Sequence, residues 1–179
     1  MTATPPPAEL RRVLGHFATG VTIVTGLAPD GAPVGFACQS FASVSLDPPL
    51  VLFCASRSGR SWPLLRDTGR FCVHVLRHEQ RELCDRFGSP TGRRYDGLDW
   101  ELSPHGAPSL PGVLMRVHGE VAQVHEAGDH DVVIGRVLGL EDGEPGRPML
   151  FYRGRFTVTE RRTSAARGEA PDGRDDFWG

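Results

Sequence analysis

Apolar positions in the first part of the chain predict one short helix followed by strands. The spacing i, i+3, i+4 and i+7 places one apolar helical face on Leu10, Val13, Leu14 and Phe17. Gly20 ends this helix, and the β-branched run at residues 21–25 predicts a strand. Residues 28–31 contain Pro, Asp and Gly, so we expect a turn there and a returning strand over residues 34–40.

The rest of the chain alternates between short apolar runs and turn residues. Paired prolines, which cannot continue a ladder, separate two predicted strands at residues 42–45 and 50–55. We expect a helix to begin near Ser61, whose hydroxyl can cap it, with Pro63 tolerated in the first turn. The further expected elements are a strand at 71–76, a helix at 79–87, a loop at 88–111 and strands at 113–125, 131–140 and 150–158.

This order of elements favours a mainly β fold. About eight strands, with no helical pattern of about 10 to 15 residues between them, predict an antiparallel β-barrel with a few short helices and not a doubly wound sheet. A chain of 179 residues has the size of one domain. We expect a flexible N-terminal lead at residues 1–9, the barrel domain at 10–160 and a polar C-terminal tail at 161–179.

Composition removes several classes of function. All 20 basic residues are Arg, and the sequence contains no Lys, which excludes Schiff-base enzymes and the P-loop lysine. The net charge is −2 and the arginines form no basic stripe, so we expect no nucleic-acid partner. No apolar run approaches the ~18 residues that span a bilayer, and no signal peptide is evident. The sequence therefore predicts a cytoplasmic protein without a membrane partner.

Metal and hydrolytic sites are not expected either. The motifs HExxH, GxSxG and GxGxxG are absent, and the cysteines never form CxxC. His74 and His78 are four residues apart only across a predicted strand-to-helix junction, so they do not share a helical face. We expect four buried, reduced thiols, at Cys38, Cys54, Cys72 and Cys84.

Four segments are candidates for ligand binding. Residues 33–41 form a strand with small side chains, which lets a flat ligand approach backbone donors. Residues 56–61 (SRSGRS) combine hydroxyls, guanidiniums and glycine ahead of a helix N-terminus, as suits a phosphate, although an ordinary surface loop also explains them. The turn at residues 128–131 (GDHD) and the strand at 151–155 (FYRGR) also have plain alternatives, a polar hairpin tip and normal strand packing.

Taken in order, these segments resemble a known family. The succession FATGVTIVT, PVGFACQSFASVSLDPPLVLFC, SRSGRSW, GDH and LFYRGRF is similar to the short-chain flavin reductases of two-component flavin monooxygenases, over roughly residues 10–158. The resemblance implies the FMN-binding split β-barrel and an NAD(P)H:flavin oxidoreductase that uses FMN or FAD with NADH or NADPH. It also implies a homodimer whose diffusing reduced flavin reaches a separate oxygenase that hydroxylates an aromatic or steroid-derived phenol. Many family members have Asn-Ser where this chain has Gln39-Ser40.

The resemblance also implies which residues form the site. His130 is expected to position the nicotinamide, near Tyr152 and Arg153. The expected flavin contacts are Pro33, Val34, Gly35, Phe36, Ala37, Gln39, Ser40, Cys54, Ala55, Ser56, Arg60, Ser61, Arg86 and Phe87. Hydride transfer from nicotinamide C4 to flavin N5 needs two stacked rings and no strong general base, which accounts for the absence of an acid–base constellation.

Two alternatives use the same fold. One is a flavin- or haem-binding split-barrel protein without turnover, acting as a carrier or sensor. The other is an enzyme of the pyridoxamine-phosphate oxidase type, which would use the Arg/Ser loop similarly but oxidise a pyridoxine substrate. NADH oxidation that depends on added flavin separates both from the reductase.

Overall fold

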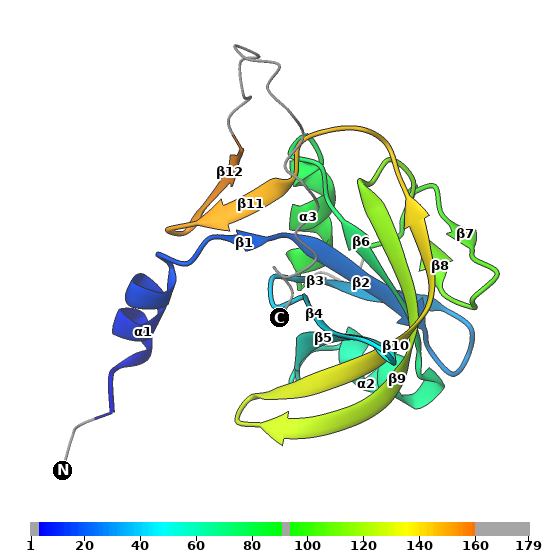
Figure 1. The fold of residues 1–179 in the computed structure, drawn as a ribbon, viewed down its shortest axis with the longest axis horizontal. Helices are drawn as coiled ribbons and strands as arrows, with labels where there is room; N and C mark the ends of the chain where they lie inside the picture. The colour runs from blue at the N-terminus through cyan, green and yellow to red at the C-terminus, as the bar shows by residue number, and fades with distance from the viewer. Residues whose placement is uncertain (1–3, 91–93, 160–179) are drawn as a thin grey trace.

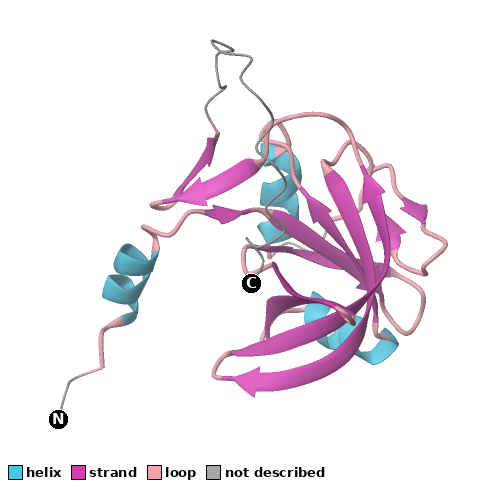
Figure 2. Cartoon of the chain, in the orientation of Figure 1, coloured by secondary structure: helices cyan, strands magenta, loops and turns pink. Residues whose placement is uncertain are grey.

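The computed structural model describes residues 4–90 and 94–159, and it consists mostly of antiparallel strands (Figures 1 and 2). In chain order the elements are α1 (Pro7–Leu14), β1 (Thr19–Gly20), β2 (Thr22–Leu27), β3 (Pro33–Cys38), β4 (Ala42–Leu46), β5 (Pro49–Ser56), α2 (Ser61–Thr68), β6 (Arg70–Val75), α3 (Arg81–Gly88), β7 (Glu101–Leu102), β8 (Pro108–Ser109), β9 (Met115–Ala127), β10 (His130–Asp142), β11 (Met149–Tyr152) and β12 (Arg155–Val158). None of the helices in these ranges is long and apolar enough to cross a bilayer.

The main sheet has seven strands in the order β3-β2-β6-β9-β10-β5-β4, and every neighbouring pair is antiparallel. Residues of β5 alternate between the core and the other face, with Val51, Phe53 and Ala55 buried. Register shifts after Ile134 and after Val137 interrupt the long β9–β10 pair, and such irregularities increase strand bending. The sheet therefore curls into the split barrel that the sequence predicts, and this expectation is confirmed.

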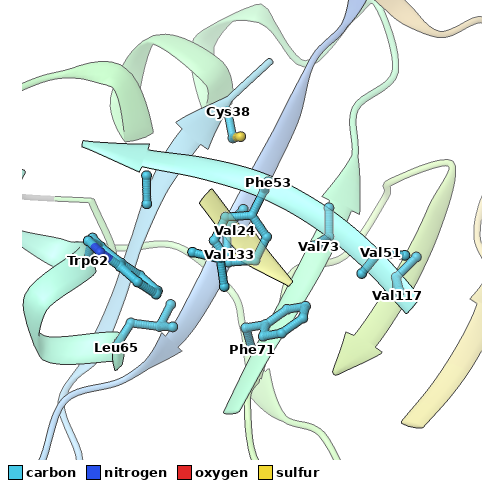
Figure 3. Packing of buried hydrophobic residues seen from close by; sticks show 11 residues of the cluster. Val24, Cys38, Val51, Phe53, Trp62, Leu65, Phe71, Val73, Val117 and Val133 are labelled. Atoms are coloured by element: carbon cyan, nitrogen blue, oxygen red, sulfur yellow. The ribbon is translucent and has the colours of Figure 1, made fainter. Parts of the chain in front are cut away.

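The interior of the barrel is filled by aromatic and branched side chains, with Phe53 at the centre of the cluster (Figure 3). Its ring lies edge-on to Phe71 and Trp62, at centroid distances of 5.2 and 6.0 Å. Phe71 fits only because Gly119 and Gly135 face it, since a Cβ on either glycine would overlap its ring. A fully buried phenylalanine of this kind contributes about 3–5 kcal/mol against truncation to alanine.

Close to the two ends of the curled sheet, β3 and the residues that follow it contact β5. No ladder joins β3 to β5. Instead the Cys54 amide donates to Ser40 Oγ at 2.8 Å, and the Cys38 thiol lies 3.8 Å from the Cys54 carbonyl. We call this contact between Cys38, Ser40 and Cys54 the seam.

A small three-stranded sheet, β1-β11-β12, extends away from the barrel with α1 (Figure 1). The helix begins at Pro7 and ends at Leu14, so the expectation that Phe17 belongs to it is wrong. Gly15 caps the helix, and Phe17 lies in the following turn with 76% of its surface exposed. No residue of α1 is buried, although three of its side chains form the expected apolar face.

Two other expectations need correction. The segment at 150–158 is a hairpin and not one strand, because Arg153 and Gly154 adopt positive φ angles of 48° and 75° and turn the chain between β11 and β12. The expected loop at 88–111 contains the short β7–β8 pair. Residues 1–3 of the expected lead and the tail at 161–179 lie outside the described residues.

Candidate functional site

A cleft opens beside the seam, formed by two adjoining cavities of about 190 and 510 Å³. Both are lined by Ala37 on β3, Cys54 on β5 and His130 at the start of β10. The smaller cavity extends toward the start of α2 and the end of α3, and the larger one toward the turn between β9 and β10. The small side chains of Ala37 and Cys54 leave room at the point where the cavities meet.

The smaller cavity contains two arginines without a counter-ion. Within residues 4–90 and 94–159, no carboxylate forms an ion pair with Arg60 or Arg94. Arg94 donates to Ser61 Oγ at 2.6 Å and to the Ser89 carbonyl at 3.0 Å, and its buried Nε has no partner. Burial, followed by repulsion from Arg60, lowers the pKa of the Arg94 guanidinium. An anion placed between the two arginines would offset both the burial of the Arg94 guanidinium and its repulsion from Arg60.

Ser61 contributes to this end of the cleft in a way the sequence did not indicate. The N-cap residue of α2 is Arg60, and no side chain caps the helix, so the expectation that Ser61 is the cap is wrong. Ser61 is the first helical residue instead, and its hydroxyl donates to the Gly35 carbonyl at 2.7 Å. The first amides of α2 therefore lack a side-chain cap beside the two arginines, which further favours an anion.

The larger cavity is bordered by the β9–β10 turn, which Gly128 permits with a φ of 66°. His130 is half-exposed, and its Nδ1 donates to Asp129 at 2.8 Å. This bond is the main reason that the pKa of the Asp129 carboxyl is lowered. It leaves Nε2 of His130 without a partner in the described part of the chain. A neutral or charged imidazole held in this way can orient a ligand at the cavity.

The structure brings most of the expected site residues to this cleft. Residues 33–41 and 56–61 form adjacent walls although they are separate in sequence. The expected residues that line one or both cavities are Phe36, Ala37, Gln39, Ser40, Cys54, Ser56, Arg60, Ser61, Phe87 and His130.

Other expected residues support the walls without lining them. The Gly35 carbonyl accepts from Ser61, and a Cβ at Gly35 would lie 2.8 Å from the Phe87 ring. The Val34 carbonyl accepts from the Tyr95 hydroxyl at 2.9 Å. Pro33 pairs with Leu27 at the far end of β3, Ala55 faces the core, and Arg86 donates to the Asp96 carbonyl at 3.1 Å.

Tyr152 and Arg153 are not brought to the cleft within one chain. They occupy the turn of the β11–β12 hairpin, where the Arg153 amide donates to the Gly15 carbonyl at 2.8 Å. The Arg153 guanidinium lies over the Tyr152 ring, 5.4 Å from its centroid. These two residues therefore belong to the extension that carries α1.

Sequence reasoning missed Arg94 and Gly88, both of which line the smaller cavity. Arg94 lies in a segment that reads as loop, more than thirty positions from the residue it bonds, Ser61. No spacing rule connects such positions. The only hint in the sequence was the aromatic residue next to it, Tyr95, which packs on Phe87 at a centroid distance of 5.2 Å.

The arrangement fits a flavin phosphate together with a flat ring. The unpaired arginines and the uncapped helix start provide an anion site, and the cleft widens past Ala37 toward His130. No cluster of three metal-ligating side chains occurs among the residues that the structure describes. The chemistry at hand is thus binding and orientation.

Comparison with known proteins also points to flavin chemistry. The reductase subunit HsaB of a flavin-dependent monooxygenase from Rhodococcus jostii RHA1 is 51% identical over 154 residues, which cover 86% of this chain and 78% of the relative. The solved structure of nitrilotriacetate monooxygenase component B from Mycobacterium thermoresistibile has a TM-score of 0.85 and 46% identity, covering 94% of this chain and 93% of that one. The NADH:FAD oxidoreductase SgcE6 of Streptomyces globisporus, solved with NAD and FAD fragments, has a TM-score of 0.82 and 32% identity, covering 90% and 99%.

A family model described as the flavin reductase like domain matches residues 14–160, which is most of the chain. The protein therefore belongs to the flavin reductase like domain family.

Proposed function

We propose that this protein reduces FMN or FAD with NADH and releases the reduced flavin to a separate monooxygenase. The observation that carries the proposal is the continuous cleft, which has Arg60 and Arg94 in its smaller cavity and His130 on the wall that both cavities share. A relative that is the reductase subunit of a monooxygenase and a neighbour solved with NAD and FAD fragments support it. We assign this activity to residues 10–160, which nearly coincide with the matched family model.

The protein's own contribution is to hold and orient two ligands. Flavin, when bound, supplies the ring that accepts the hydride. Arg60, Arg94 and the start of α2 hold its phosphate, while the wall at Ala37 and Cys54 leaves space for the ring. His130 orients the nicotinamide through Nε2 because Nδ1 is occupied by Asp129. No residue has to remove a proton from carbon for the hydride to move.

Release of flavin follows from the nature of these contacts. The cleft is open, and Arg60 and Arg94 in its anion site are partly exposed. We expect micromolar affinity, about −8 kcal/mol, so flavin is lost during purification.

The test places the protein and NADH on one side of a dialysis membrane and an acceptor of reduced flavin on the other, under anaerobic conditions. Added FMN should carry reducing equivalents across. Flavin that stays bound through gel filtration, with no transfer, would support the carrier alternative.

NADH is the expected nicotinamide because none of the described residues that line the larger cavity is a free cation for a 2′-phosphate. Arg57 is paired with Glu126 at 3.2 Å, and Asp129 is almost fully exposed beside His130. We expect kcat/KM to be at least about tenfold higher for NADH than for NADPH, since an unpaired phosphate beside a carboxylate loses at least 1.4 kcal/mol. Equal values would contradict this assignment.

A homodimer accounts for the exposed face of α1, where Leu10, Val13 and Leu14 are 50–63% exposed. A second copy covering this face would bring the adjacent Tyr152 and Arg153 into the interface. Light scattering after gel filtration should show twice the chain mass. The variant Leu14→Asp should shift the protein to monomer, and a monomeric wild-type protein would remove this part of the proposal.

A further inference from the structure

Asp131 is an unusual residue in the core of this protein. Its side chain is only 1% exposed, and no other Asp or Glu among the described residues is buried. The Trp62 indole donates to its Oδ2 at 2.8 Å, and its Oδ1 accepts no hydrogen bond. Arg57 and Arg66 each approach the carboxylate at 3.7 Å from more exposed positions. Burying a carboxylate that is only partly satisfied is costly, so stability alone does not account for it.

The contacts of Asp131 join three segments that border the cleft. Trp62 follows Ser61 at the start of α2, and Arg57 belongs to the loop that leads to Arg60. Asp131 itself follows His130 in β10. The Arg57 amide also donates to the Asp129 carbonyl at 3.1 Å, which binds the same loop to the β9–β10 turn.

A purely structural role would be filled equally well by other residues. The indole N–H needs only one acceptor, which a neutral amide supplies. The negative charge also attracts two guanidiniums, Arg57 from the loop and Arg66 from α2, which a neutral amide would not. The charge is therefore the property that needs a functional explanation.

We propose that Asp131 is a positioning residue that couples the two ends of the cleft, an inference that rests on the proposed flavin reductase function. It holds α2 and the loop so that Arg60 and Ser61 face the flavin phosphate. Through β10 it also fixes His130, which orients the nicotinamide. Loss of its charge should weaken the binding of both flavin and nicotinamide. A change confined to the phosphate contacts or to His130 would weaken the binding of only one of them.

The experiment compares Asp131→Asn with the wild-type protein. This change keeps the shape and an acceptor for Trp62 but removes the charge. Fluorescence titration measures the Kd of FMN and of riboflavin, which lacks the phosphate, and steady-state kinetics measure KM for NADH at saturating FMN. We expect the FMN Kd to rise about tenfold, the riboflavin Kd to change less than twofold, and KM for NADH to rise at least threefold with kcat within twofold.

Asp67→Asn is the matched control, because Asp67 is an exposed acid of α2 that lines, together with Asp131 and Trp62, a separate cavity of about 340 Å³. It should leave all four quantities unchanged. Should Asp131→Asn fail to fold, as judged by circular dichroism, the double variant Arg57→Gln/Arg66→Gln provides a second test, because it removes the two exposed guanidiniums that approach the carboxylate. It should raise the FMN Kd and the KM for NADH in the same direction, and unchanged values would overturn the coupling.

A folded variant that keeps the wild-type ratio of FMN to riboflavin affinity, or the wild-type KM for NADH, overturns the coupling and leaves the proposed function intact. Wild-type protein that binds riboflavin as tightly as FMN overturns the phosphate site and this inference with it. A wild-type protein that shows the FMN preference but no FMN-dependent NADH oxidation overturns the reductase function and the coupling to nicotinamide.

Discussion

Replacing Arg94 by methionine should weaken FMN far more than riboflavin. The side chain keeps its aliphatic length but loses the guanidinium that faces Arg60 across the smaller cavity. Two of its N–H groups are used by Ser61 and Ser89, and its buried Nε has no hydrogen-bond partner. Ser61 keeps its bond to Gly35, so the wall itself should remain in place.

The magnitude follows from the kind of contact. A hydrogen bond to a charged group contributes about 1.5–3 kcal/mol. At about 1.4 kcal/mol per tenfold change, Arg94→Met should raise the FMN Kd by roughly ten- to a hundredfold. Arg60→Ala should have an effect of the same size, because we propose that both guanidiniums bind one phosphate. Riboflavin affinity should change by less than about twofold in either variant.

Fluorescence quenching of the flavin gives both dissociation constants directly. The phosphate loses its second charge below a pKa of about 6, so the preference of the wild-type protein for FMN should shrink between pH 7.5 and pH 5.5. In Arg94→Met this pH dependence should be weaker. An unchanged FMN Kd in the variant, or an equal loss for riboflavin, would refute the assignment of Arg94 to the phosphate.

Three further predictions concern the nicotinamide end, acid stability and the wall of the cleft. His130→Ala should raise KM for NADH more than it lowers kcat, and a kcat loss beyond about 10³-fold at constant KM would instead indicate acid–base chemistry at His130. Burial lowers the pKa of His74 to about 3, so the folded state binds fewer protons than the unfolded state between pH 6.5 and 3, and stability decreases as the pH falls through this range. The free energy of unfolding measured in urea should therefore decrease by about 1.4 kcal/mol from this residue between pH 7.5 and 5.5. His74→Gln should remove this decrease. Gly35→Ala places a methyl 2.8 Å from the Phe87 ring, so we expect a stability loss of about 1–3 kcal/mol in urea together with weaker flavin binding, and a fully stable variant would show that α3 adapts.

The barrel was predictable because most of its strands carry their own alternation or β-branched run and are followed by turn residues. Residues 33–41 and 56–61 were also recognisable as binding segments, since small residues on a strand and a hydroxyl–guanidinium loop before a helix are local signals. The structure shows that they share one cleft, while their roles in binding remain proposals.

Other features depend on tertiary contacts that no local pattern encodes. Arg94 reaches Ser61, and Asp131 reaches Trp62, across large sequence separations. The apolar spacing of α1 correctly indicated an apolar face, but spacing alone does not say what covers it. The turn at Arg153 and Gly154 was missed because the residues on both sides are equally good strand formers.

The seam has a consequence for any effort to redesign ligand size. Cys38 and Ser40 border the larger cavity, and their side chains also make the contacts to the backbone of Cys54 that join β3 to β5. Replacing either residue to admit a different ring system would therefore also remove a contact between these two strands. An engineer would do better to change the β9–β10 turn or the end of α3, which border the same space but take no part in joining β3 to β5.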